Sequence, residues 1–267
     1  MNPNLSEWIN LALRWFHIFA GILWVGQTFF FAWLDRTLAK EEAGAGKPQV
    51  WMVHSGGFYV MEKQKGVELQ SRTLHWFKWE AALTWLSGML LLGLVYHMGG
   101  LMVDADSTIS VGRAAGIGTL AIILGWVVYD LLWMSPLGKS ETVGVVVCYG
   151  LLVALAYGLT QAMSGRAAYM HVGAVLGTIM TANVWMRIIP AQRRMVAAAR
   201  EGNALDPSLA ARAKQRSRHN TFMVFPVVAI MISNHFPVAT YGNNYNWAVL
   251  GALVLVGWAA AAIIRRM

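Results

Sequence analysis

Residues 15–34 read WFHIFAGILWVGQTFFFAWL, a run of 20 residues without a formal charge that carries one histidine, His17. A helix of about 20 apolar residues spans the ~30 Å hydrocarbon core of a bilayer, so this run predicts a membrane-spanning helix. Hydrophobic residues make up 57% of the 267-residue chain and charged residues 13%, which excludes an ordinary soluble domain. We therefore expect a polytopic membrane protein.

Apolar runs of similar length recur along the chain and predict about seven transmembrane helices. The expected spans are residues 9–33, 75–97, 113–134, 142–162, 167–187, 220–237 and 246–264. The predicted fold class is an all-α integral membrane protein, with residues 1–267 in a single polytopic domain. A weaker pattern aligns His17 with His171 and His75 with His219, which is compatible with a parallel repeat of two helix bundles.

Basic residues concentrate in two connections between the expected spans. Residues 35–73 carry six Lys or Arg and residues 188–218 carry seven, so the positive-inside rule predicts that both connections are cytoplasmic. With seven spans, the N-terminus is then periplasmic and the C-terminus cytoplasmic, in the inner membrane of a bacterium. The net charge of +8 gathers on this face, where it suits anionic lipid headgroups, and no nucleic-acid partner is expected.

The two basic connections are too long to be simple turns. The first contains an aromatic and β-branched stretch broken by Gly56-Gly57, which is compatible with a small β-hairpin near the membrane. The second is rich in Ala and Arg, with a break at Asp206-Pro207, and predicts two solvated or interfacial helices.

Six of the seven histidines lie inside or at the ends of the expected spans, where an unpaired imidazole is costly. Neutral imidazole is a common axial ligand of haem iron, so these residues predict a haem site. The only cysteine, Cys148, excludes a covalent Cys-x-x-Cys-His attachment, and the expected cofactor is therefore non-covalent haem b.

The first span carries the sharpest local pattern. His17, Gly21 and Trp24 share one helical face, where a flat macrocycle could lie, and Arg14 on the preceding turn could meet a propionate. His171 is expected at a similar depth. His17 and His171 are therefore the first choice for the two axial ligands.

Two further histidines fall closer to the outer surface, at the ends of their spans. His97 and His235 are the alternative ligand pair, or they gate the haem edge. Each of these histidines could instead form hydrogen bonds with a neighbouring helix.

Ionisable residues also gather at the cytoplasmic end of the second span. His75 and Lys78 share a helical face, and Glu80 lies one turn into the membrane, where a carboxylate needs a partner. Interfacial Trp and snorkelling Lys explain part of this pattern without any function. Glu80 and Asp130, in the third span, nevertheless mark the best places for a polar substrate pocket or a proton path.

Several separated segments resemble the membrane domain of the bacterial cytochrome-linked urate hydroxylases. The resemblance covers nearly the whole chain and is carried by residues 14–27, the segment HSGGFY at 54–59, residues 74–80, and residues 171–192. It implies a membrane domain of eight spans followed by a periplasmic cytochrome c domain. It also implies hydroxylation of urate to 5-hydroxyisourate without hydrogen peroxide.

The chain differs from that plan in holding seven expected spans and no Cys-x-x-Cys-His, so a separate cytochrome c is the expected electron acceptor. Urate is a planar anion, which an indole-rich and cationic pocket could stack and neutralise. We place it near the catalytic candidates His54, His75, Lys78 and Glu80, together with His219. Haem at the opposite membrane face would be too distant for a single electron hop.

Two other functions remain open from the residues. A haem-b electron-transfer or cofactor-handling subunit without urate activity fits the missing cytochrome domain. A small-molecule transporter fits the weak repeat and the intramembrane Glu80 and Asp130.

Overall fold

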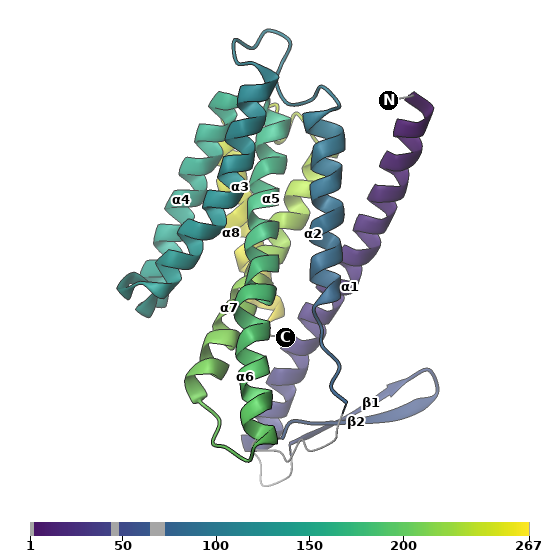
Figure 1. The fold of residues 1–267 in the computed structure, drawn as a ribbon, viewed down its shortest axis with the longest axis vertical. Helices are drawn as coiled ribbons and strands as arrows, with labels where there is room; N and C mark the ends of the chain where they lie inside the picture. The colour runs from purple at the N-terminus through teal and green to yellow at the C-terminus, as the bar shows by residue number, and fades with distance from the viewer. Residues whose placement is uncertain (1–2, 44–47, 65–72, 267) are drawn as a thin grey trace.

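Helices dominate the computed structural model, which describes residues 3–43, 48–64 and 73–266 (Figure 1). The α-helices of this part of the chain are α1 Pro3–Ala43, α2 Trp79–Leu92, α3 Val111–Met134, α4 Glu141–Ala162, α5 Gly165–Ala182, α6 Ile189–Arg200, α7 Pro207–Ile232 and α8 Asn246–Ile264. Two π-helical turns, Gly93–His97 and Asn183–Ile188, follow α2 and α5, and two 3-10 turns, Pro136–Lys139 and Ser233–His235, follow α3 and α7. The predicted all-α fold class is confirmed.

Six helices of the described chain are long and apolar enough to cross a membrane. They are Pro3–Glu42, Trp79–His97, Val111–Met134, Glu141–Ala162, Gly165–Arg200 and Asn246–Ile264. Each overlaps a predicted span, and the helices Pro3–Glu42 and Gly165–Arg200 extend well beyond the predicted bounds 9–33 and 167–187. The remaining predicted span, 220–237, begins in the second half of α7, whose first half is strongly basic, and this helix packs against α5 and α8.

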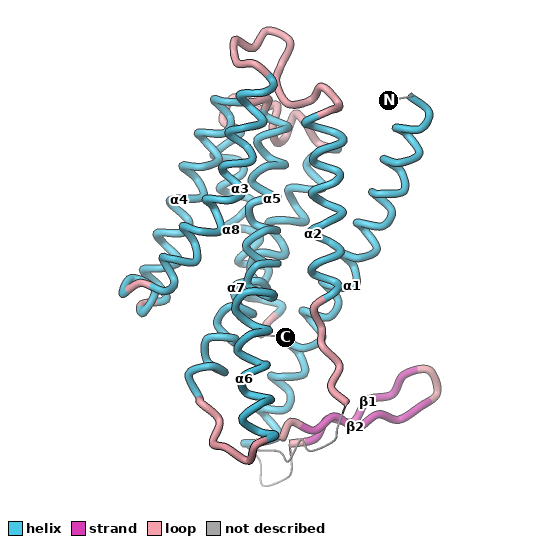
Figure 2. Tube along the Cα trace, viewed as in Figure 1, coloured by secondary structure: helices cyan, strands magenta, loops and turns pink. Residues whose placement is uncertain are grey.

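The small β-hairpin expected in the first basic connection is present. Strands β1 (Gln49–His54) and β2 (Gly57–Glu62) pair antiparallel, with His54 opposite Gly57 (Figure 2). The two turn residues, Ser55 and Gly56, both have positive φ, which suits the right-handed twist of a two-residue hairpin. The hairpin marks one end of the molecule, which we call the hairpin end. The opposite end, with the connection 98–110, is the loop end.

Helix α5 lies at the centre of the bundle, and every residue from Ala167 to Leu176 is buried. Glycines on α3 explain how closely the two helices approach. A Cβ atom at Gly118 would lie 2.5 Å from the ring of His171, and one at Gly125 would lie 2.5 Å from the side chain of Val175. Small residues allow such close packing within membranes, where helix association depends on van der Waals contact.

The second basic connection also folds as predicted. It forms α6 and the first half of α7, joined by a short break at residues 201–206. Asp206 caps α7 by accepting a 2.8 Å hydrogen bond from the backbone N–H of Ser208, and this hydrogen bonding lowers the pKa of the Asp206 carboxyl.

Candidate functional site

A cavity of about 570 Å³ opens near the hairpin end, between α1, the segment leading into α2, and α7. We call it the Glu80 cavity. Its aromatic lining consists of Trp24, Phe31, Trp76 and Phe77. Its ionisable lining consists of Asp35, Arg36, His75, Glu80, Lys214, Arg218 and Arg265. A pocket of this size holds a small planar molecule.

One atom on each of two oppositely charged side chains of the Glu80 cavity lacks a partner, while Arg36 Nη1 donates to the carbonyl oxygen of Arg265 at 3.0 Å. Glu80 Oε2 and Arg36 Nε are buried and form no hydrogen bond with any described residue. Two other charges of the lining are paired, since Asp35 binds Lys63 at 2.5 Å and Arg218 pairs with Glu141. Because a buried polar atom without a partner is costly, Glu80 Oε2 and Arg36 Nε are the atoms most in need of a polar ligand.

The structure brings together only part of the predicted catalytic set. His75 and Glu80 both line the Glu80 cavity, as does Trp24, which the sequence had assigned to the haem. Lys78 lies over the ring of Trp185, 5.3 Å from its centroid, and is not among the lining residues.

His54 is also separate from the Glu80 cavity. It ends strand β1 at the tip of the hairpin, where its exposed ring is hydrogen-bonded to Ser55 Oγ at 2.9 Å. Arg36 was not predicted as a site residue, although a cation two residues after the uncharged run 15–34 is a signal that could have identified it.

Two predicted haem ligands meet towards the loop end of the bundle. The rings of His97 and His171 are nearly parallel, with an interplanar angle of 14° and centroids 5.7 Å apart. His171 is fully buried, and its Nδ1 donates to the carbonyl oxygen of Ala167 at 2.8 Å. The Nε2 atoms of both rings are buried and find no partner in the described chain. Because His171 carries its proton on Nδ1, its Nε2 lone pair is uncommitted.

His17 faces a different part of α2. Its Nδ1 donates to the carbonyl oxygen of Thr84 at 3.0 Å, and its ring packs against Gly88. Gly88 precedes His97 by nine residues, which is about 13 Å along a helix axis. The structure therefore does not bring His17 and His171 together at a common depth, unlike the sequence-based expectation.

The two remaining residues assigned to the haem are exposed. Arg14 donates to Asn10 Oδ1 at 2.7 Å on the same helix. His235 ends the 3-10 turn after α7. Its proposed partner His97 is stacked on His171 instead.

A second polar group is buried between α3, the π-helical turn after α5, and α7. We call it the Tyr129 cluster, and its members are Tyr129, Asp130, Trp133, Asn183, Arg187, Arg216, His219 and Asn220. Asp130 forms ion pairs with both Arg187 and Arg216, so this carboxylate inside a span has the partners that it requires. Sequence reasoning identified Asp130 and His219 but missed Asn183, although a polar residue inside an apolar run is a usable signal.

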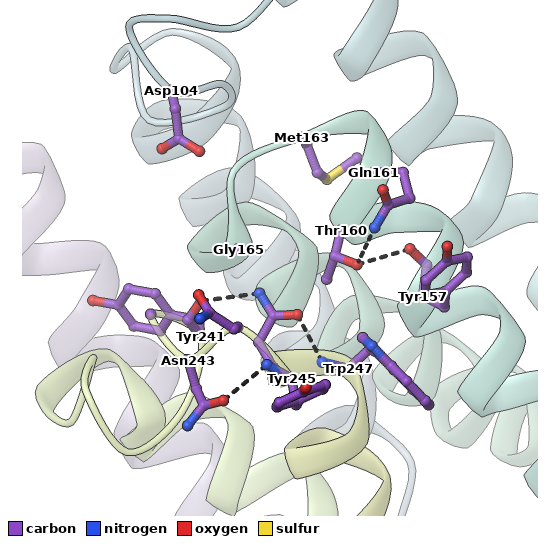
Figure 3. Close-up of a pocket in the computed structure, with 13 residues that line it drawn as sticks. Asp104, Tyr157, Thr160, Gln161, Met163, Gly165, Tyr241, Asn243, Tyr245 and Trp247 are labelled. Atoms are coloured by element: carbon purple, nitrogen blue, oxygen red, sulfur yellow. Dashed lines mark hydrogen bonds between the residues drawn. The ribbon is translucent and has the colours of Figure 1, made fainter.

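A second cavity, of about 480 Å³, lies at the loop end (Figure 3). Its polar groups are largely satisfied by local hydrogen bonds, such as Asn246 Nδ2 to the carbonyl oxygen of Tyr241 at 3.0 Å. Asp104 is the one formal charge in its lining, which contains none of the predicted site residues. The Glu80 cavity is therefore the better candidate for a charged substrate.

Comparison with known proteins identifies one family. The family described as "Urate oxidase N-terminal" matches residues 3–266, which is nearly the whole chain. No curated protein and no solved structure matches the chain. The match agrees with the resemblance carried by the first span, the hairpin segment and α5, and it indicates a urate-related function. The chain thus belongs to the urate oxidase N-terminal family.

Proposed function

We propose that this protein binds urate in the Glu80 cavity and hydroxylates it to 5-hydroxyisourate, with haem b and a separate cytochrome c carrying the electrons away. The observation that supports this proposal is the cavity itself, which combines aromatic walls with an unpartnered guanidinium N–H of Arg36 and an unpartnered carboxylate oxygen of Glu80. A planar purine anion offers the complementary features, since it stacks on aromatic rings and pairs with a guanidinium group.

The proposed reaction adds the oxygen of one water molecule to C5 of urate. Urate and water give 5-hydroxyisourate, two protons and two electrons, so the site must remove protons as well as electrons. Glu80 is the proposed proton acceptor, because its Oε2 is buried and uncommitted. Arg36 is the proposed anchor for the negative charge of the substrate. His75, in the same lining, offers an exit for the proton.

The histidines near the loop end fit haem b. His171 presents an unprotonated Nε2 held in place by the Nδ1 bond to Ala167, and His97 presents a second uncommitted Nε2 on a nearly parallel ring. The His171 ring packs closely against α3, since its Nε2 lies 2.5 Å from where a Cβ of Gly118 would be. We therefore propose that His171 and His97 would hold haem b, with His17 as the competing choice. When bound, haem b supplies a one-electron carrier between the substrate and the acceptor.

The electron path depends on which histidines hold the haem. The Glu80 cavity reaches up to Trp24, which is seven residues from His17 on α1, or about 10 Å along the helix axis. His17 packs against Gly88, and His97 lies about 13 Å farther along the helix axis, so the path to the proposed pair is the longer one.

Turnover by the purified protein tests this proposal. We expect a protein with a haem b spectrum that converts urate to 5-hydroxyisourate when a cytochrome c or an artificial electron acceptor is supplied. No hydrogen peroxide should form, because oxygen is not the acceptor. Full haem loading without urate turnover would instead show that the protein is an electron-transfer or cofactor-handling subunit. A purified protein that lacks a haem spectrum and carries urate into vesicles would show that the function is transport.

The proposed sidedness has its own test. We expect the basic connections, and with them the Glu80 cavity, to face the cytoplasm of a bacterium. A reporter fused after Arg218 should be active only as a cytoplasmic fusion, and a reporter near Gly242 only as a periplasmic fusion. The reverse activities would place the Glu80 cavity on the outer face of the membrane.

A further inference from the structure

A hydrogen-bonded chain of side chains runs through the Tyr129 cluster. Asn220 Nδ2 donates to the carbonyl oxygen of Met180 at 2.9 Å, which leaves the side-chain oxygen of Asn220 as an acceptor. Asn183 Nδ2 donates to that oxygen at 2.9 Å and also to the hydroxyl oxygen of Tyr129 at 3.1 Å. The Tyr129 hydroxyl hydrogen is then directed to His219 Nδ1, 2.7 Å away. Anchoring of Asn220 at a backbone carbonyl thus fixes the donor in each of these hydrogen bonds: Asn183 donates to both of its neighbours, and Tyr129 donates to His219.

These donor assignments determine which ring nitrogen of His219 carries the proton. A neutral imidazole that accepts a hydrogen bond at Nδ1 carries its proton on Nε2. His219 Nε2 is buried and has no hydrogen-bond partner in the described chain. It is therefore a donor that lacks an acceptor.

Two neighbouring donors are in the same state. Trp133 Nε1 and Arg216 Nη1 are also buried without a partner among the described residues. The Trp133 ring lies 4.2 Å from the His219 ring, centroid to centroid, and the Arg216 guanidinium lies 5.0 Å from the centroid of the Tyr129 ring. Trp133, Arg216 and His219 are each at most 8% exposed. Asn183 Oδ1 is an acceptor of the same cluster that is also buried without a partner among the described residues, so unpartnered donors outnumber it three to one. Because buried polar groups are normally hydrogen-bonded, this excess of donors indicates a ligand that accepts hydrogen bonds.

The charges of the Tyr129 cluster indicate the sign of that ligand. Asp130 supplies one negative charge and faces the two positive charges of Arg187 and Arg216. The cluster therefore carries one positive charge in excess, with Arg216 buried and the Arg187 side chain 38% exposed. An anion would neutralise it and would fill the vacant donors at the same time.

The three donors lie outside the Glu80 cavity. The Glu80 cavity reaches Asn220, but Trp133, Arg216 and His219 are not part of its lining. A purine in that cavity would therefore not contact the three donors. We propose that Trp133, Arg216 and His219 form a site for a small monovalent anion of about halide size, separate from the urate site and independent of the urate reaction.

Chloride binding tests the proposal directly. The purified protein, prepared in detergent with gluconate as the only bulk anion, should bind radiolabelled chloride saturably, with one chloride for each chain. Trp133→Phe removes a single donor while keeping an aromatic ring, and we expect it to weaken chloride binding about tenfold or more, because hydrogen bonds to charged partners are strong. Trp126→Phe makes the same change two turns earlier on α3 and should alter chloride affinity less than about twofold.

A second measurement needs no variant. Added chloride should raise the thermal unfolding midpoint of the wild-type protein, whereas gluconate at equal ionic strength should not, because only the bound anion stabilises the folded state. The anion site is rejected if the wild-type protein shows no saturable chloride binding or if Trp133→Phe binds chloride as tightly as Trp126→Phe. Displacement of chloride by saturating urate would also overturn it, because the donors would then belong to the substrate site. These outcomes are independent of urate turnover and haem binding.

Discussion

Replacing His171 with alanine should abolish stable haem binding. The His171 side chain lies on the central, most buried helix, and its Nε2 is the proposed ligand that is best fixed in direction, because Nδ1 is held by Ala167. We expect purified His171→Ala protein to retain less than about a tenth of the haem of the wild type, as measured by the Soret absorbance per chain. Added imidazole should restore part of this absorbance in His171→Gly, which separates ligand loss from misfolding.

The same spectra distinguish the two possible ligand pairs. If His97 is the second ligand, His97→Ala should keep the haem but convert a low-spin spectrum to a high-spin one, while His17→Ala stays low-spin. The opposite result would restore the pair His17 and His171 inferred from the sequence. His54→Ala is the matched control, because His54 is exposed at the hairpin tip and its loss should leave the spectrum unchanged.

Changing Glu80 to glutamine should abolish most urate turnover while leaving the haem in place. Glutamine has nearly the same shape as glutamate but cannot accept a proton, and general bases contribute about 10²–10⁴-fold to a rate. We therefore expect kcat for urate to fall by about 100-fold or more, with a much smaller change in KM. Urate loss in the presence of an artificial electron acceptor measures both constants, and the unchanged Soret band shows that the protein is folded.

A matched change elsewhere controls for the loss of one negative charge. Glu201→Gln alters an exposed carboxylate in the break between α6 and α7, where it binds Asn203, and should leave kcat within about twofold of the wild type. Turnover by Glu80→Gln within about threefold of the wild type would show that another group accepts the proton.

Long-range packing explains where the prediction of the site stopped. His17 and His171 were paired because each was expected at a similar depth, a few residues inside the outer end of its predicted span. Their actual neighbours depend on which helices touch: the His171 ring packs against Gly118 of α3 and lies nearly parallel to the ring of His97. Similarly, Trp24 belongs to the face of α1 that lines the Glu80 cavity. A helical face can be read from the sequence, but the helix that covers it cannot.

The sequence by itself determined the helical membrane architecture, because spans depend on local composition and length. The hairpin also followed from local rules, since Gly56 permits the positive φ that its turn requires. Only the tertiary structure decided that Glu80 shares a cavity with Arg36 and that His219 ends a hydrogen-bonded chain from Asn220. These groups are distant in sequence, and their contacts depend on side-chain packing between helices, which no local pattern encodes.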